Sequence, residues 1–590
     1  MMHLLILWGF LGLFAGTVLV AIDHWLDHFL RGTFYLWFSF SLEICGLMLI
    51  GGVIWAMVRR YVQRISRLER RAEDFIVILW LLVVALSGFS VEAARLAAET
   101  SQGPNWGQWS FVGLWASAFW PTYTHALNAY PYLWWGHGIL SLSFITYIPF
   151  SKLFHIMAAP ASIFLHSRPV TVLPVKDRAA STDIYTAREL ISFDACTRCG
   201  RCVDVCPSQN ANEPFSPRAF VSWAKEICSL KYNPLLKKEA GFNVSDSTND
   251  DFSSKSLWHC TSCRACIEIC PVYIDTPESI RLARSKLVEE GTQMPTFLTV
   301  ALKNLYKYNN PWEASKKGRA KWAEGMNIVD LTATTNTNPG LCYFVGCTTS
   351  IDLRAQKLAI SFARILNFAG ASFGTLGKKE PCCGDIARRC GEDGLFEMKM
   401  GDCVSLFAKH GIKDVVTSSP HCYNAFQNDY PAYQALKDPK ERIDFRARHY
   451  THVLKQLIET GALKFNTRLH TRVTYHDPCY LGRYNRIFDM PRKIIRSIPG
   501  VQLIEMAHNR EDSLCCGGGG DRMWQEDLDG NPKMSEIRIR EAVATGAEIV
   551  ITACPLCLIM LEDARKTAAL EDKIKVLDLN ELVTQALGLG

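Results

Sequence analysis

The chain has 590 residues, of which 48% are hydrophobic, so it can form several packed domains and is neither disordered nor collagen-like. The net charge is only +6, and six arginines lie within the single short segment 59–71. Because the basic excess is local, we expect no nucleic-acid surface.

The first 160 residues contain four long apolar stretches, at about 3–22, 33–58, 75–98 and 131–151. Each is near or above the ~20 residues that a helix needs to cross a bilayer core, so the segment is predicted to be a multi-pass membrane domain. Met1-Met2-His3 leads straight into the first stretch without the basic start of a signal peptide, which predicts a retained helix. The Arg-rich loop predicts a cell-membrane protein with its amino terminus and everything after residue 160 in the cytoplasm.

Histidines in and beside these stretches are candidate haem ligands. His137 and His155 are 18 residues apart in what reads as one helical stretch. That spacing is five turns and would put both rings on one face, about 27 Å apart. A histidine within a membrane is costly without a partner, and haem iron would be such a partner. The spacing fits two haems stacked across the bilayer. The alternative is one buried polar histidine and one interfacial histidine.

A family resemblance favours haem. The segments that carry it are 135–137, 148–156, 51–53 and Arg59-Arg60. They resemble the last helices of the cytochrome b subunit of respiratory nitrate reductases, in which two histidines of the final helix each pair with a histidine of an earlier helix. The resemblance implies one or two haem b groups on His137 and His155. The second and third spans lack histidine, so the candidate partner ligands are His3 at the cytoplasmic end and His24 or His28 at the outer end.

Three other ionisable residues lie within the spans: Glu43, Glu92 and Arg95. They could form a proton path or line a quinone pocket. The alternative, which we favour, is a structural ion pair between Glu92 and Arg95.

After a predicted linker at 166–185, two runs share the spacing C-x2-C-x2-C-x3-C-P. The spacing is typical of bacterial ferredoxins with two cubane [4Fe–4S] clusters, in which the fourth cysteine of each run binds the other run's cluster. Structural zinc takes ligand pairs set well apart, and disulfides do not persist in a reducing cytoplasm, so both alternatives are disfavoured. The predicted ligand sets are Cys196, Cys199, Cys202 and Cys270 for one cluster, and Cys260, Cys263, Cys266 and Cys206 for the other.

Residues 341–590 contain one motif twice, in copies at about 341–465 and 466–590. Offsets of 132 to 135 residues keep the two copies in register. Ser419 stands in the first copy where the second has Cys554. The motif cysteines are Cys347, Cys382, Cys383 and Cys422 in the first copy, and Cys479, Cys515, Cys516, Cys554 and Cys557 in the second.

The motif cysteines follow apolar runs that predict strands at 414–417, 473–475 and 549–552. A helix that begins after such a strand offers N–H groups to anionic sulfur, which suits an iron–sulfur site. The glycine run 517–520 would let the backbone approach a bulky cluster. His421, His476 and Asp477 are candidates for proton transfer there, with structural hydrogen bonding as the alternative for each.

Adjacent cysteines fit the separate corners of one tetrahedral metal site poorly, which indicates a larger or open cluster. The second copy resembles the catalytic CCG domains of heterodisulfide reductases, and this implies a non-cubane [4Fe–4S] cluster on its five cysteines as the catalytic centre. For the first copy, the occupancy stays open. Cys342, Cys390 and Cys403 could substitute for the missing cysteine or be buried thiols.

The predicted fold class is multidomain: an α-helical membrane bundle (1–165), an α-helical ferredoxin domain (186–300), a connector (301–340) and an α/β duplicated CCG domain (341–590). The whole chain resembles fused membrane-bound iron–sulfur oxidoreductases. The resemblance implies an enzyme that passes electrons from reduced electron-transfer flavoprotein to menaquinone. We find no convincing Gly-rich NAD or FAD fingerprint, so any flavin is expected on the partner. The alternatives are a quinol-dependent heterodisulfide or disulfide reductase, which Ser419 weakens, and a relay subunit of a larger respiratory complex, which the fused cytochrome weakens.

Overall fold

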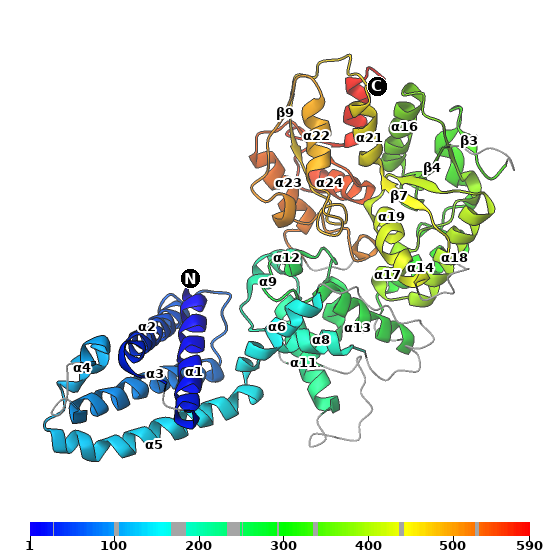
Figure 1. Cartoon of the computed structure of the whole chain (residues 1–590). Helices are drawn as coiled ribbons and strands as arrows, with labels where there is room; N and C mark the ends of the chain where they lie inside the picture. The colour runs from blue at the N-terminus through cyan, green and yellow to red at the C-terminus, as the bar shows by residue number, and fades with distance from the viewer. Residues whose placement is uncertain are drawn as a thin grey trace. The chain divides into compact units, whose positions relative to one another are not determined.

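The structure is a computed structural model of the whole chain (Figure 1). It describes residues 1–26, 29–99, 106–166, 184–232, 248–249, 252–291, 294–333, 340–435, 442–525 and 530–589. Almost all of the predicted linker at 166–185 lies outside these residues, as does His28. The chain forms two compact units, one of Met1–Ile156 with Thr197–Gly200 and the other of Met157–Cys196 with Arg201–Gly590.

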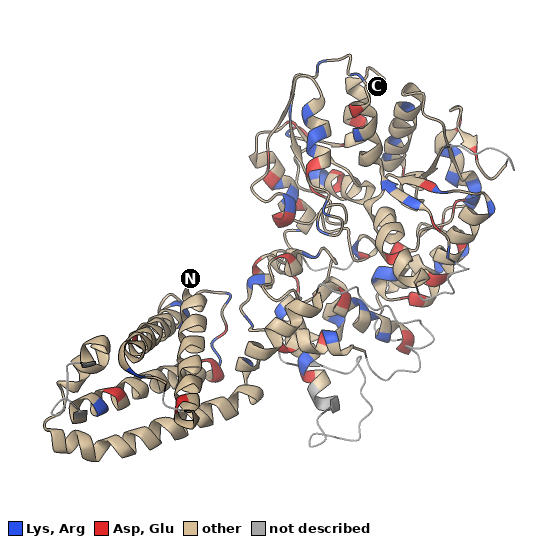
Figure 2. Cartoon of the chain, viewed as in Figure 1, with Lys and Arg blue, Asp and Glu red and all other residues tan. Residues whose placement is uncertain are grey.

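The first unit is a bundle of apolar helices. Its helices are α1 (Met2–Trp25), α2 (Gly32–Met57), α3 (Ala72–Glu99), α4 (Phe111–Ser117) and α5 (Tyr123–Tyr147). Three of the four predicted spans are single helices long and apolar enough to cross a membrane: α1, α2 with its π-helical continuation to Val62, and α3. Charged residues are sparse on these helices (Figure 2). Glycine lets α1 pack closely on α2, because a Cβ at Gly9 would lie 2.7 Å from the carbonyl oxygen of Cys45.

The fourth predicted span is broken. After α5 the chain makes two 3-10 turns, Ile148–Phe150 and Lys152–Phe154, and α6 (His155–His166) then runs at an angle of 82°. Pro149 has no N–H to continue the helical hydrogen bonds, and Ser151 is extended, with φ −127° and ψ 174°. The prediction that His137 and His155 share one face of one continuous helix is therefore wrong.

The second unit starts with a helical part that contains the ferredoxin cysteines other than Cys199, which belongs to the first unit. Its longer helices enclose a core that includes Phe193, Phe220 and Trp223. Three four-residue helices lie within or directly after the cysteine runs: α9 (Arg201–Asp204), α10 (Pro207–Asn210) and α12 (Ala265–Glu268). The other elements are α8 (Ala187–Asp194), α11 (Pro217–Tyr232), the hairpin of β1 (Thr248–Asn249) and β2 (Phe252–Ser253), α13 (Thr276–Glu290) and α14 (Thr296–Tyr308).

Two parallel sheets form the rest of this unit, so the predicted α/β class is confirmed. The first has the order β3-β5-β4-β6-β7, and the second has the order β11-β10-β8-β9. The first sheet contains β3 (Val329–Asp330), β4 (Leu341–Phe344), β5 (Phe373–Thr375), β6 (Asp414–Thr417) and β7 (Arg446–His449). The second contains β8 (Thr471–Tyr475), β9 (Val501–Leu503), β10 (Ile549–Thr552) and β11 (Lys575–Asp578).

Helices connect the strands of each sheet and cover its faces (Figure 1). In the first copy they include α15 (Cys347–Ile351), α16 (Leu353–Phe368), α17 (Asp385–Cys390), α18 (Asp393–Lys409), α19 (Pro420–Asn424), α20 (Tyr430–Gln434) and α21 (Tyr450–Glu459). In the second copy they are α22 (Asp489–Ser497), α23 (Met534–Ala544), α24 (Pro555–Thr567) and α25 (Leu579–Ala586).

Each sheet has one point at which the strand order reverses. β4 lies between β5 and β6, and β8 lies between β9 and β10. The connections leaving the two central strands diverge at such a point and leave a crevice beyond the strand ends. Cys347 and Ser419 follow β4 and β6, while Cys479 and Cys554 follow β8 and β10. The duplicated fold therefore positions both cysteine motifs at equivalent crevices.

Candidate metal centres

The second copy gathers its five cysteines into one buried cluster. Cys515 interacts electrostatically with Cys479 and Cys516, and Cys557 interacts with Cys516 and Cys554. None of the five is more than 9% exposed, and none forms a disulfide. A water-excluded set of sulfur donors fits an iron–sulfur cluster.

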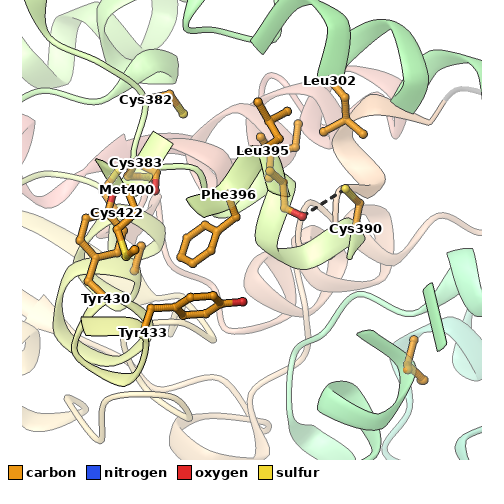
Figure 3. Close-up of a cluster of buried hydrophobic side chains, with 14 of the residues drawn as sticks. Leu302, Cys382, Cys383, Cys390, Leu395, Phe396, Met400, Cys422, Tyr430 and Tyr433 are labelled. Carbon is orange, nitrogen blue, oxygen red and sulfur yellow. Dashed lines mark hydrogen bonds between the residues drawn. The ribbon is translucent and has the colours of Figure 1, made fainter. Parts of the chain in front are cut away.

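The first copy brings its four cysteines together in the same way. The Sγ atoms of Cys347 and Cys382 are 3.7 Å apart, and Cys383 interacts electrostatically with Cys382 and Cys422. Figure 3 shows Cys383 and Cys422 near Tyr430. A cavity of about 50 Å³ is lined by these four cysteines together with Ser419, Gly518, Asp521 and Trp524. The cavity therefore has residues of both copies in its wall.

The three other cysteines of the first copy are buried thiols in this structure. Cys390 donates to the carbonyl oxygen of Ala387 at 3.3 Å and lies apart from the motif cysteines (Figure 3). Cys403 donates to the carbonyl oxygen of Cys382 at 3.5 Å, and Cys342 is buried within β4. None of these contacts replaces the thiol missing at Ser419.

One predicted ferredoxin ligand set is assembled. Cys206 from the first run and Cys260, Cys263 and Cys266 from the second line a cavity of about 20 Å³. This is the crossed combination expected from the spacing, with the fourth cysteine of one run among the first three of the other. The other set, Cys196, Cys199, Cys202 and Cys270, consists of half-buried cysteines and stays a prediction.

The loop around residues 260–263 of the second ferredoxin run, called the ferredoxin loop below, packs against the second-copy site. Cys263 shares a buried cluster with Cys479, Tyr480 and Cys515, and it interacts electrostatically with Cys515. The buried Arg483 donates to the carbonyl oxygens of Cys263, at 2.6 Å, and Ser513, at 2.7 Å. Cysteines of two predicted cluster sites thus lie in one buried cluster.

The predicted glycine run accommodates this loop. A Cβ at Gly520 would lie 2.3 Å from the carbonyl oxygen of Cys260, and one at Gly519 would lie 2.6 Å from that of Thr261. The buried Arg284 also donates to the carbonyl oxygens of Cys260 and Gly520. Gly519 and Gly520 lie against the backbone of the ferredoxin loop, which leaves no room for a Cβ. From the sequence we expected the glycine run to lie close to a cluster.

His421 links the two copies. Its Nδ1 lies 2.7 Å from Oδ2 of Asp385, and the ring interacts electrostatically with Cys554. Burial opposes protonation of His421, but the Asp385 carboxylate outweighs it and raises the pKa to about 10. Burial also opposes ionisation of Cys554, but hydrogen bonds from Cys557 and His421 outweigh it and lower the pKa of that thiol to about 5.

His476 and Asp477 have different surroundings. A ring nitrogen of His476 and the Sγ atoms of Cys516 and Cys557 lie within 4.8 Å of one another. Asp477 instead accepts two hydrogen bonds from the guanidinium group of the buried Arg492, at 2.6 and 2.8 Å. Asp477 is therefore held in a structural ion pair, and His476 is the residue that faces the sulfurs.

In the apolar unit, the structure brings His3 and His155 together. Their ring centroids are 6.2 Å apart, and Nδ1 of His155 hydrogen-bonds to the carbonyl oxygen of Lys152 at 2.8 Å, which leaves Nε2 for a metal. Two imidazoles that bind one iron from opposite sides have centroids about 6 Å apart, because each metal–nitrogen bond is about 2 Å long. The donor set and its spacing fit a haem iron.

The other candidate haem ligands are dispersed. His137 hydrogen-bonds through Nδ1 to the hydroxyl of Ser87 at 2.8 Å. The ring of His24 lies 6.3 Å from that of Trp25, near the end of α1. No pairing of His137 with His24 follows from these contacts, and His28 lies outside the described residues.

The ionisable residues of the spans have structural partners. Arg95 donates to Glu92 at 3.2 Å, which confirms the predicted ion pair. Glu43 accepts from the backbone N–H groups of Val112 and Gly113, at 3.0 and 3.1 Å. Glu43 therefore anchors α4 to α2.

Three protein families match successive parts of the chain. Residues 1–174 match the nitrate reductase gamma subunit, residues 192–274 match the 4Fe-4S dicluster domain, and residues 341–427 and 473–562 match the cysteine-rich CCG domain. The predicted resemblances are thereby confirmed as family matches.

Relatives match the chain over most of its length. An EtfAB:quinone oxidoreductase of Syntrophomonas wolfei is 30% identical over 99% of this chain and 87% of its own length. The probable iron-sulfur-binding oxidoreductase FadF of Bacillus subtilis is 31% identical over 94% and 84%, respectively. A subunit of the dihydromethanophenazine:CoB–CoM heterodisulfide reductase of Methanosarcina barkeri is 33% identical over 69% of this chain and 97% of that protein.

Proposed function

Because the chain belongs to the family of membrane-anchored iron–sulfur oxidoreductases that includes EtfAB:quinone oxidoreductase, we propose that it transfers electrons from reduced electron-transfer flavoprotein to menaquinone. In this proposal the five second-copy cysteines hold a non-cubane [4Fe–4S] cluster, and the ferredoxin cysteines hold two cubane clusters. His3 and His155 hold one haem b, and His137 is a ligand of a second haem. When bound, these groups supply one-electron steps between a two-electron flavin donor and a two-electron quinone.

The shared burial of Cys263 and Cys515 in one cluster carries the proposal. Cys263 is a proposed ferredoxin ligand and Cys515 a proposed second-copy ligand, and the two share one buried cluster with Cys479 and Tyr480. Both cysteines are buried, at 6% and 3% exposure, so water is excluded from their surroundings. Arg483 and Arg284 hold the ferredoxin loop in place by donating to its carbonyl oxygens.

The proposal includes an orientation. The Arg-rich loop between α2 and α3 favours the cytoplasmic side of the cell membrane, and with it the amino terminus, His3 and the iron–sulfur part. The quinone then enters from the lipid bilayer, and the flavoprotein meets the chain from the cytoplasm.

Anaerobic stopped-flow spectroscopy of the detergent-solubilised protein tests the donor. The haem absorption band is followed after mixing with reduced electron-transfer flavoprotein and, separately, with low-molecular-weight dithiols. Fast reduction by the flavoprotein, reversed by a menaquinone analogue, is the expected result. Reduction by thiols alone would favour a quinol-dependent disulfide reductase, which the similarity to a heterodisulfide reductase subunit makes the second candidate.

Substituting one second-copy cysteine tests the path. In Cys515→Ser or Cys516→Ser we expect donor-driven haem reduction to be abolished, because the second-copy cluster that accepts electrons from the donor loses a ligand. Haem per protein should stay unchanged. Cys228→Ser, at a half-buried cysteine of α11 outside both motifs, is the matched control and should reduce haem at the wild-type rate. Wild-type rates in the Cys515 and Cys516 variants would remove the second copy from the path.

A further inference from the structure

Two histidines flank the second-copy cysteines without being needed to complete that set of five thiols. We propose that His476 and His421 donate N–H hydrogen bonds to second-copy sulfur atoms and thereby raise the reduction potential of the cluster bound there. The inference rests on the proposed function, since it requires a cluster in the second copy. Both histidines are positioning residues and neither binds iron.

The proton position on His476 follows from its neighbour. Nε of Arg538 lies 3.0 Å from Nδ1 of His476, and both side chains are buried. A guanidinium group has donors and no acceptor, so Nδ1 must be the acceptor and carry a lone pair. The ring proton is then on Nε2.

Nε2 of His476 is the nitrogen left for the sulfurs. It is buried and has no hydrogen-bond partner among the described protein atoms. By distance alone the ring, Cys516 and Cys557 could share a metal ion. A protonated nitrogen cannot bind iron, however. A buried N–H needs a hydrogen-bond acceptor, and the nearby sulfur atoms can accept from it. The position equivalent to His476 in the first copy is Phe344, which has no donor.

His421 approaches the same site from the first copy. Asp385 accepts from its Nδ1–H, and the imidazole stacks on Tyr480 with ring centroids 3.9 Å apart, so the ring is fixed in position. The imidazole also interacts electrostatically with Cys554, and His421 lines the cavity between the two copies. A cysteine sulfur bound to iron is an acceptor only, so His421 must be the donor in this interaction.

The Asp385–His421 pair is particular to the first copy. The equivalent positions in the second copy are Gly518 and Leu556, which have no polar side chain. The copy that has Ser419 in place of a cysteine therefore supplies a hydrogen bond to the copy with the full motif. Hydrogen bonds to cluster sulfurs stabilise the more negative, reduced state, and this raises the potential.

Redox titration of the detergent-solubilised holoenzyme, followed by electron paramagnetic resonance, tests the inference. His476→Leu and His421→Leu should each shift the second-copy potential to more negative values. His476→Gln and His421→Gln, which keep an N–H, should shift it less. The exposed His470→Asn should leave it unchanged. Potentials equal to wild type in both leucine variants would overturn the inference.

A measurement on the unmodified protein decides the question if the leucine variants lose iron. Electron–nuclear double resonance should detect an exchangeable proton coupled to the second-copy cluster that disappears in D2O. With ¹⁵N-histidine it should show only weak nitrogen coupling, and strong coupling from an iron–nitrogen bond would overturn the inference. A second-copy signal that persists in Cys515→Ser would instead count against the proposed function, so the two failures are distinguishable.

Discussion

Buried arginines hold the loops that present the cysteines. Arg492 has no exposed side-chain surface and makes two hydrogen bonds each to Asp477 and Glu505. Asp477 is itself 3% exposed and lies two residues before Cys479. The arginine therefore both compensates a buried carboxylate and fixes the start of the second-copy motif.

We expect Arg492→Met to destabilise the iron–sulfur unit by about 3 kcal/mol or more, because it leaves a buried carboxylate without its charged partner. Arg472→Met is the matched control. Arg472 pairs with Glu548 at 3.5 Å with both side chains 53% exposed, so its loss should cost less than about 1 kcal/mol. Denaturant unfolding followed by circular dichroism measures both, and equal midpoints in the two variants would contradict the assigned role.

At the scale of elements, the glycine loop 517–520 packs closely against the ferredoxin loop around Thr261. Gly520→Ala should force the two loops apart, because the new Cβ would lie 2.3 Å from a backbone oxygen. Gly546→Ala is the matched control, since Gly546 also has a positive φ, +72° against +61°, but has open space around it. The control isolates the backbone strain, which costs about 1 kcal/mol.

Hydrogen–deuterium exchange distinguishes the two glycine variants. Amides of residues 257–263 and 515–524 should exchange faster than wild type in Gly520→Ala and at the wild-type rate in Gly546→Ala. Unchanged exchange in Gly520→Ala would mean that the loops do not depend on this close approach.

Local patterns in the sequence predict the elements better than their assembly. The apolar runs correctly predict the strands that end at Thr417, Tyr475 and Thr552, because a buried parallel strand must be apolar on both faces. The break between α5 and α6 has a local cause, Pro149, but the apolar composition continues through it and suggests one span. His421 and Cys554 interact across the two copies from positions 133 residues apart, and no sequence motif predicts that they meet.

At the scale of the whole molecule, a single chain combines a membrane-anchoring part with cysteine sites of two kinds. The family matches follow one another along the sequence in the order membrane part, ferredoxin part and CCG part. Composition alone separates the apolar part from the cysteine-rich part. The haem ligands are harder to predict, because only the three-dimensional packing of α1 against the start of α6 brings His3 to His155. Sequence spacing singled out His137 and His155 and left their partners open.

Haem content tests this pairing. His3→Ala and His155→Ala should lower haem per protein by the same amount, because an iron between two imidazoles loses an axial bond in either variant. His137→Ala should remove haem separately, so a variant lacking both His137 and His155 should retain the least. The pyridine haemochrome assay measures each, with His125→Ala, at an exposed histidine in the first turn of α5, as the control that keeps the full complement. Full haem in His3→Ala beside a loss in His155→Ala would show that the partner ligand is another residue.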